Sequence, residues 1–258
     1  MPFTPPSSGF VDSDGVKIHY ETYGEGFPII LVHGFAASIA LNWTATGWID
    51  ALTPLRRVVA LDCRGHGLSD KPHGPAAYDG DRMERDVLNV MDHLGIEKAD
   101  LFGYSMGSFI ALGLLAHHKQ RFRSVILGGA GNVLEGLPAD AGRSIAQGLA
   151  ADDTSTVTDP VGLAFRMFAQ LDPNNDLKAL AACAGNPAPP IDAAAFAAVD
   201  IPVLIAKGAN DDVTSNVRAT AEAIPGARLL MIPDRDHLTV VADQRFKDAV
   251  LAFLKERA

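Results

Sequence analysis

The sequence predicts an α/β fold with a mostly parallel sheet, and three observations carry this prediction. Short apolar runs typical of buried strands alternate along the chain with longer segments whose apolar residues recur at helical spacing. The chain has 258 residues, of which 48 % are hydrophobic, enough for one large core. A glycine-flanked turn at 103–107 joins a strand-like run directly to a helix-like run. Such alternation favours right-handed crossovers and therefore parallel strands.

The chain is expected to begin with an antiparallel pair at one edge of the sheet. Asp14-Gly15 separates the runs 10–11 and 16–20, and this dipeptide is typical of a hairpin turn. Apolar residues at helical spacing then predict a helix over 83–94 and a last helix over 246–254.

The turn at 103–107 has the sequence Gly-Tyr-Ser-Met-Gly. The run 99–102 before it is strand-like, and the run 108–116 after it is long enough for a buried helix. A serine on so sharp a strand-to-helix turn projects from the sheet, and the flanking glycines avoid a Cβ clash. The helix aims its first N–H groups at the same place and stabilises negative charge there. Ser105 is therefore the candidate nucleophile.

The serine needs a base, which in proteins with this turn follows later in the chain. Three of the eight histidines lie after Ser105. His117 and His118 would lie about 18 Å along the helix that starts at the serine. His237 instead follows the strand-like run 229–232, at the edge where open α/β sheets place their ligands. His237 is therefore the candidate base.

An acid that orients the histidine is expected in the loop beyond the strand-like run 202–208. Asp211 and Asp212 both lie there, and adjacent residues seldom face the same way. Asp234 and Asp236 lie too close to the histidine in the chain to reach its ring squarely, and they predict a polar turn.

The negative charge that develops during acyl transfer needs two backbone N–H donors. One is expected from Met106, the residue after the nucleophile, and the other from the loop after the strand-like run 28–32. Phe35 in that loop would donate through its main chain. His33, beside it, is interpreted as a structural imidazole that bonds loop carbonyl groups.

Taken together, five motifs resemble the α/β-hydrolase fold family: the turn at 103–107, His33-Gly34-Phe35, the segment 62–69, the loop 208–211, and His237. The resemblance covers nearly the whole chain and is closest to serine carboxylesterase, lactonase and cofactor-free haloperoxidase-like members. It implies an eight-stranded, mostly parallel sheet flanked by helices, with a helical cap inserted after strand six. It also implies a catalytic triad in which Asp211, rather than Asp212, is the acid. The segment 62–69 resembles a structural loop whose Asp62 and Arg64 pin neighbouring loops.

Two departures from related members narrow the expected reaction. Members that open epoxides use a carboxylate where this chain has Ser105, and usually carry proline where it has Ala36. Serine indicates an acyl-enzyme route, hence a hydrolase of small to medium neutral esters or lactones. The alternatives are a hydrolase of C–C bonds, a cofactor-free perhydrolase, or a non-enzymatic protein that senses a small ester or lactone.

The alternation of strands and helices breaks over 131–199, which is expected to be the cap, leaving 1–130 and 200–258 as the core. Asp159-Pro160 predicts a helix start, with Asp as the N-cap and Pro at the first helical position. Further helices are expected over 140–150, 175–184 and 192–199.

The substrate pocket is expected to be apolar. Its predicted lining is Phe35 and Tyr104 from the core and, from the cap, Phe165 and Phe168 with their neighbours Met167 and Leu171.

The remaining expectations concern partners and location. The net charge of −9 disfavours nucleic acid and anionic membranes, and residues 1–8 show no leader-like pattern. Cys63 and Cys183 form no metal or disulfide framework, so reduced thiols in a cytoplasmic protein without metal or cofactor are expected. The oligomeric state is left open.

Overall fold

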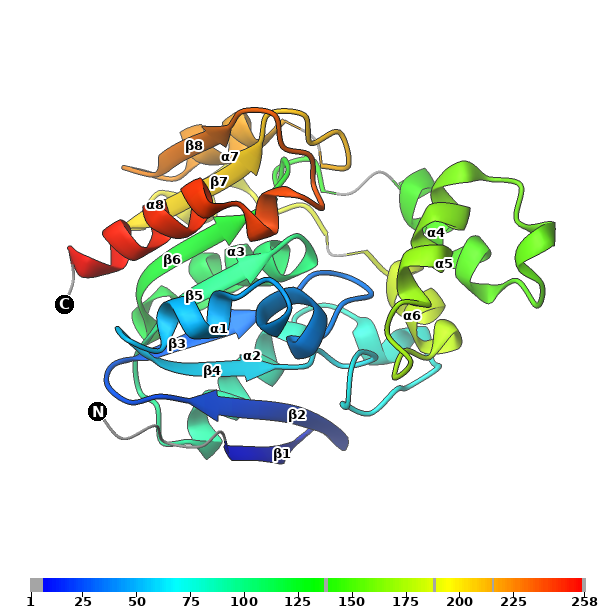
Figure 1. Cartoon of the computed structure of the whole chain (residues 1–258), viewed down its shortest axis with the longest axis horizontal. Coiled ribbons are helices and arrows are strands. Elements are labelled where there is room, and N and C mark those ends of the chain that lie inside the picture. The colour runs from blue at the N-terminus through cyan, green and yellow to red at the C-terminus, as the bar shows by residue number, and fades with distance from the viewer. Residues whose placement is uncertain (1–6, 137–138, 188, 215, 257–258) are drawn as a thin grey trace.

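The chain folds around an eight-stranded sheet with the order β1-β2-β4-β3-β5-β6-β7-β8 (Figure 1). The computed structural model describes residues 7–136, 139–187, 189–214 and 216–256. Residues 1–6 of the segment 1–8, which was expected to show no leader-like pattern, lie outside the described residues. The strands are β1 (Ser7–Ser13), β2 (Val16–Tyr23), β3 (Pro28–Val32), β4 (Arg57–Leu61), β5 (Ala99–Tyr104), β6 (Phe122–Gly128), β7 (Val203–Gly208) and β8 (Arg228–Ile232).

Pairing in the sheet is antiparallel at one edge and parallel elsewhere. β1 pairs with β2, and β2 with β4, in antiparallel fashion, whereas the other neighbours are parallel. The predicted hairpin is confirmed: Asp14 and Gly15 have φ of 55° and 82°, the positive values that a two-residue hairpin turn requires.

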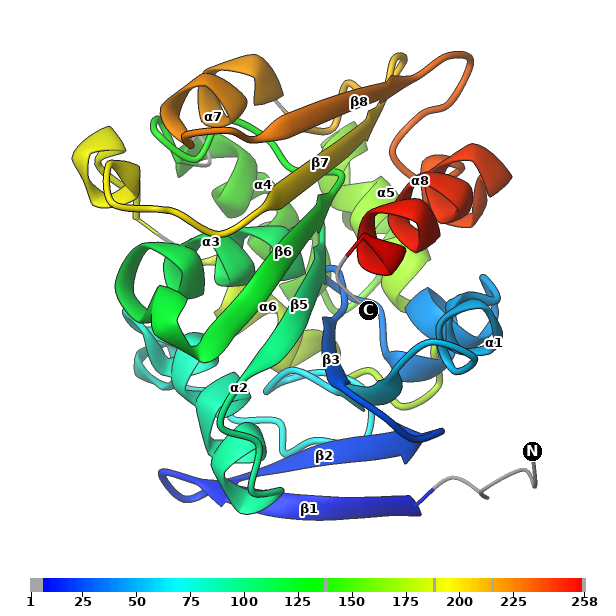
Figure 2. The same cartoon turned by 90° about the vertical axis from the view of Figure 1, so that its left-hand side faces the viewer.

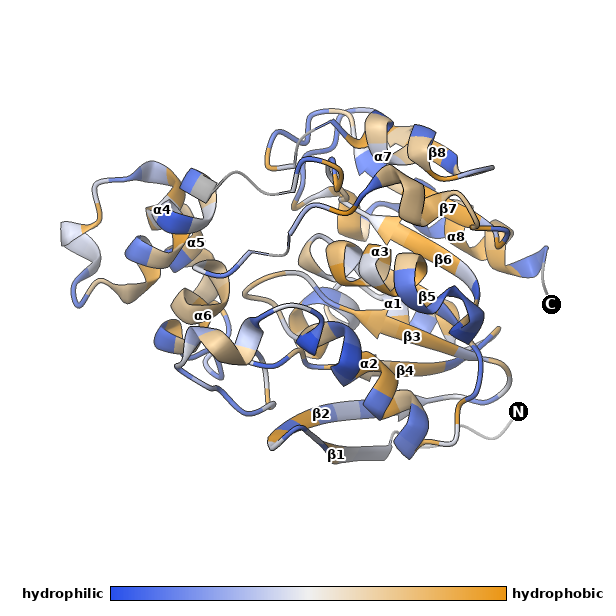
Figure 3. Ribbon diagram, turned by 180° about the vertical axis from the view of Figure 1, so that it is seen from behind, coloured by the Kyte–Doolittle hydropathy of each residue, from blue (hydrophilic) through white to orange (hydrophobic). Residues whose placement is uncertain are grey.

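Helices cover both faces of the sheet (Figure 2). One face packs against α2 (Arg82–His93), α3 (Met106–His118) and α7 (Val217–Ala223). The other packs against α1 (Trp48–Leu52) and α8 (Gln244–Lys255). The central strands are hydrophobic along their length (Figure 3), because parallel strands covered on both faces alternate between two apolar environments.

Three further helices stand beyond the carboxyl ends of the parallel strands (Figure 1): α4 (Ala139–Ala150), α5 (Pro160–Ala169) and α6 (Leu177–Ala184). The start of α5 is as predicted, since Asp159 Oδ1 accepts the N–H of Gly162 at 2.7 Å. Gly148 of α4 lies so close to Gly162 that a Cβ on it would come within 2.5 Å of that backbone. The glycines therefore let the two helices pack at backbone contact.

The expected helix over 192–199 is wrong. The structure has only a 3₁₀ turn, η5 (Ala193–Phe196), because Phe196 is fully buried against the core and the chain must then turn into β7. The other short elements are η1 (Ile39–Thr44), η2 (Pro75–Tyr78), η3 (Lys119–Arg121), η4 (Thr154–Thr156) and η6 (Val240–Ala242). None of the helices that the structure describes is both long and apolar enough to cross a membrane.

Candidate active site

Ser105 lies at the turn between β5 and α3, with φ of 52° and ψ of −115°. A non-glycine residue in such a conformation stores strain of about 1–3 kcal/mol, which the surroundings must hold. The N–H of Ser105 donates to the carbonyl of Gly128 on the neighbouring strand β6 at 2.8 Å. The sheet therefore fixes the turn, and the helix dipole of α3 begins at the serine.

Both glycines of the turn are required by close backbone approach. A Cβ on Gly103 would lie 2.1 Å from the carbonyl oxygen of Gly107, and one on Gly107 would lie 2.0 Å from that of Val32. The start of α3 is thus packed directly onto β3 and β5, which brings Ser105 to the end of the central strands.

We expect Gly107→Ala to lower the free energy of unfolding by about 3 kcal/mol or more, because its Cβ meets backbone rather than a flexible side chain. Thermal denaturation would show this as a fall in Tm of roughly 6 °C or more. Gly74→Ala is the matched control: Gly74 has φ of −81° and nothing within 4 Å of an added Cβ. Equal Tm values for the two variants would contradict this account of the turn.

His237 lies in the loop after β8 and faces Ser105. Its Nε2 lies 2.9 Å from Ser105 Oγ, and its Nδ1 lies 2.8 Å from Asp211 Oδ2. Only 7 % of the histidine is exposed. His117 and His118 end α3, and His117 contacts Glu84 instead. Of the three histidines considered, the structure brings His237 to the serine.

Asp211 is held in the loop after β7 by several donors. Its Oδ1 accepts the N–H groups of Val213 and Thr214, and its Oδ2 accepts the Thr214 hydroxyl as well as facing His237. Burial raises the pKa of Asp211. The hydrogen bond and charge of His237 and the charge of Lys207 lower it by more, so the pKa of Asp211 lies below its usual value. Asp212 is exposed. The geometry thus favours Asp211 as the orienting acid.

Lys207 is a buried cation behind this acid that the sequence analysis missed. It is 5 % exposed, and its Nζ donates to the carbonyl and hydroxyl oxygens of Thr214 and lies 4.0 Å from Asp211 Oδ1. A lysine inside an apolar strand next to the acid-bearing loop was the available signal. It contributes positive potential where Asp211 must stay ionised.

The backbone N–H groups of Phe35 and Met106 are the expected oxyanion donors. Met106 is the first residue of α3, and Phe35 lies in the loop after β3, where an added Cβ on Gly34 would come within 3.3 Å of the Ser105 Cβ. Among the described residues, neither Phe35 nor Met106 donates its N–H to another group. Their role as donors to an oxyanion at Ser105 stays a prediction.

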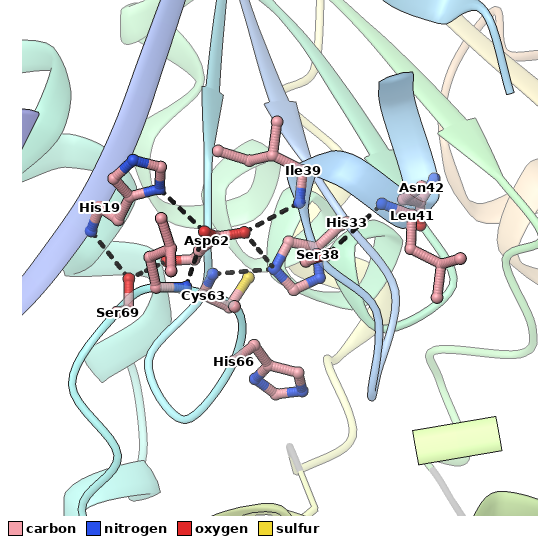
Figure 4. A network of polar contacts seen from close by, with 12 residues as sticks. His19, His33, Ser38, Ile39, Leu41, Asn42, Asp62, Cys63, His66 and Ser69 are labelled. Carbon is pink, nitrogen blue, oxygen red and sulfur yellow. Dashed lines mark hydrogen bonds and ion pairs between the residues drawn. The ribbon is translucent and has the colours of Figure 1, made fainter. Parts of the chain in front are cut away.

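A buried polar network supports the loop that carries Phe35 (Figure 4). Asp62 accepts hydrogen bonds from His19 and from the N–H groups of Ile39 and Leu68. His33 accepts the N–H of Cys63 at Nε2 (2.9 Å) and donates from Nδ1 to the carbonyl of Gly34 (2.7 Å). Burial lowers the pKa of His33, which keeps it neutral in this role. The structural interpretation of His33 is thus supported.

The expected pocket residues lie in different surroundings. Contrary to the expectation of a substrate contact, Tyr104 is 4 % exposed and donates its hydroxyl to the carbonyl of His237. The Tyr104 side chain lies with Phe102 on the sheet face that packs against α1 and α8. Its hydroxyl therefore supports the loop that carries His237. The Phe165 ring lies 5.9 Å from that of Phe35. Phe168 and Phe35 both pack against a small apolar cluster formed by Ala36, Leu149, Ala169 and Leu180.

The other two apolar residues of the expected cap lining are exposed. Met167 and Leu171 are 59 % and 65 % exposed, so they face solvent. Substrate contact by Phe35, Phe165 and Phe168 stays a prediction.

Comparison with known proteins places the chain in a family. Residues 28–243 match the model of the alpha/beta hydrolase fold. The 2-hydroxymuconate semialdehyde hydrolase of Pseudomonas sp. strain CF600 is 36 % identical over 131 residues, which are 48 % of this chain and 45 % of that protein. The chain therefore matches less than half the length of that relative.

Solved structures resemble the chain over nearly its full length. Est816, described as an N-acyl homoserine lactone degrading enzyme, is 29 % identical with a TM-score of 0.74, covering 95 % of this chain and 100 % of the other. The enol-lactonase of Burkholderia xenovorans LB400 is 25 % identical with a TM-score of 0.81, covering 96 % and 100 %. Because the family model matches most of the residues of this chain, the chain belongs to the alpha/beta hydrolase fold family.

Proposed function

We propose that the protein is a serine hydrolase that cleaves small to medium neutral carboxylic esters or lactones through an acyl-enzyme. The observation that carries this proposal is the unbroken hydrogen-bonded series from Asp211 through His237 to Ser105, with distances of 2.8 and 2.9 Å. A serine activated in this way attacks carbonyl carbon. The resemblance to an N-acyl homoserine lactone degrading enzyme and to an enol-lactonase supports the substrate class.

The reaction follows from the positions of the groups. Ser105 Oγ attacks the carbonyl carbon while His237 Nε2 takes its proton, and the N–H groups of Phe35 and Met106 stabilise the oxyanion. The C–O bond to the leaving alkoxide breaks as His237 returns the proton to it. Water then attacks the acyl carbon, with His237 again as base, and releases the acid and free Ser105.

We also propose that 131–199 forms a cap over the core made of 1–130 and 200–258. Leu149, Ala169 and Leu180 of α4, α5 and α6 pack in one apolar cluster with Ala36, the residue next to the proposed oxyanion donor. Substrates would therefore bind between an apolar cap and the serine.

A C–C bond hydrolase with the same triad is the second candidate. The identity to 2-hydroxymuconate semialdehyde hydrolase favours it. A vinylogous 1,5-diketone, assayed beside esters and lactones, separates the two candidates: the higher kcat/KM identifies the reaction. Turnover of none of them, with ligand binding retained, would favour a sensing protein instead.

We expect kcat/KM along a series of p-nitrophenyl esters from acetate to palmitate to reach its maximum at short to medium acyl length. Each methylene that the apolar pocket accommodates adds about 0.8 kcal/mol of favourable burial, about fourfold in kcat/KM. Beyond that length the cap should clash with the chain and the rate should fall. A maximum at palmitate would overturn the proposed preference and the interpretation of the cap.

A further inference from the structure

One side chain of the segment between α5 and α6 reaches the loop that carries Phe35. Asn175 Nδ2 donates to the carbonyl oxygens of Ala36 at 2.9 Å and of Ala169 at 3.0 Å. Both neighbours are acceptors, so only the NH₂ side of the amide can face them. The Oδ1 atom is buried without a hydrogen-bond partner, which is the penalty of this orientation.

The carbonyl that Asn175 holds belongs to a peptide with a second hydrogen bond. The same peptide unit carries the N–H of Ala37, which donates to the carbonyl of Gly34 at 3.2 Å. The Gly34 carbonyl in turn belongs to the peptide unit that carries the N–H of Phe35. A trans peptide points its C=O and N–H in opposite directions. Holding the Gly34 oxygen on one side therefore aims the Phe35 N–H to the other.

The loop needs such support because its conformation is unfavourable. Ala36 has φ of 57°, a left-handed conformation that costs an L-residue about 1–2 kcal/mol. His33 donates to the same Gly34 oxygen, and Asn42 Oδ1 accepts the N–H of Gly34. Beside them, Ser38 donates to Asp172, a second link from the loop to the segment before α6.

The geometry points to Asn175 as a positioning residue of the oxyanion site: it orients the Phe35 N–H through the two peptide units at 36–37 and 34–35. Successive hydrogen bonds of this kind also polarise one another, so the Phe35 donor is strengthened as well as aimed. The segment of α4 to α6 is then part of the catalytic apparatus as well as a cover. This inference rests on the proposed acyl-enzyme function, because only an oxyanion at Ser105 uses the donor.

The test compares Asn175→Leu with Asn186→Leu. Asn186 is the matched control, since its Nδ2 joins the residues just after α6 to the core, through Asp79 and the carbonyl of Pro75, but has no link to the loop at 34–37. Loss of an entire oxyanion donor lowers kcat by about 10²–10³. A donor that is misaimed rather than removed should lower kcat about tenfold, which is roughly 1.4 kcal/mol, with KM within about twofold.

A second readout measures the oxyanion directly. The affinity of a trifluoromethyl ketone, which forms a tetrahedral adduct on Ser105, should fall about as much as kcat in Asn175→Leu and stay unchanged in Asn186→Leu. Asn175→Asp is the second variant, to be used if the leucine variant does not fold. It keeps the volume of the side chain but cannot donate a hydrogen bond when ionised, so the same losses are expected.

The outcomes are distinct. Unchanged kcat and adduct affinity in a folded Asn175 variant, with only a lower Tm, would make Asn175 a structural link and overturn the inference. A higher KM with unchanged kcat would also overturn it, in favour of a pocket contact. Undiminished ester turnover by a Ser105→Ala variant would refute the proposed function itself, and the inference with it.

Discussion

Replacing Ser105 by alanine is expected to lower kcat/KM for ester hydrolysis by roughly 10⁵–10⁶-fold, because no other group can form the acyl-enzyme. The hydroxyl contacts His237 Nε2 and is only partly buried, so its removal should leave Tm nearly unchanged. Steady-state kinetics with a p-nitrophenyl ester measures the loss. A fluorophosphonate probe, followed by mass spectrometry of the labelled peptide, should modify Ser105 alone.

The control is Ser7→Ala, which removes a hydroxyl on the edge strand β1 that contacts the Thr22 hydroxyl on the neighbouring strand β2. This variant should keep wild-type activity and labelling. Substantial hydrolysis by Ser105→Ala, or a label on another residue, would refute the serine mechanism.

Local features of this site could be predicted from the sequence. The turn at 103–107 is specified by two glycines whose absent Cβ atoms permit close backbone contacts, and such a requirement is visible in the residue types themselves. The hairpin at Asp14-Gly15 and the N-cap at Asp159 are equally local. Each depends on a few consecutive residues, and each is present in the structure.

Other features depend on contacts between distant segments. Tyr104 was expected at the substrate, but it lies with Phe102 on the sheet face that packs against α1 and α8. The alternation of side chains along β5 was visible in the sequence and could have indicated this. Asn175 lies 139 residues from Ala36 in the chain, and no local pattern announces their hydrogen bond. The choice between Asp211 and Asp212 depends on a turn in which the N–H of Asp211 donates to Gly208. Only the folded loop determines which carboxylate faces His237.

That choice leads to the second large effect, which is expected for Asp211→Asn. Two backbone N–H groups donate to Oδ1, so the oxygen of the new amide should occupy that position. Its NH₂ group would then face His237 Nδ1 and donate to it. The histidine proton would be held on Nε2, which could no longer accept the proton of Ser105. An exchange of this kind lowers kcat by about 10⁴-fold.

Asp212→Asn is the matched control, because it makes the same chemical change one residue away on an exposed side chain. It should keep kcat within about twofold, since exposed charges contribute weakly through water. Both variants should remain folded by circular dichroism, so that the ratio of their kcat values reports the histidine tautomer. If Asp212→Asn were the inactive variant, the acid would be misassigned, although Ser105 and His237 would keep their roles. If neither variant lost activity, His237 would need no orienting carboxylate, and the 2.8 Å contact between Asp211 and His237 would be structural only.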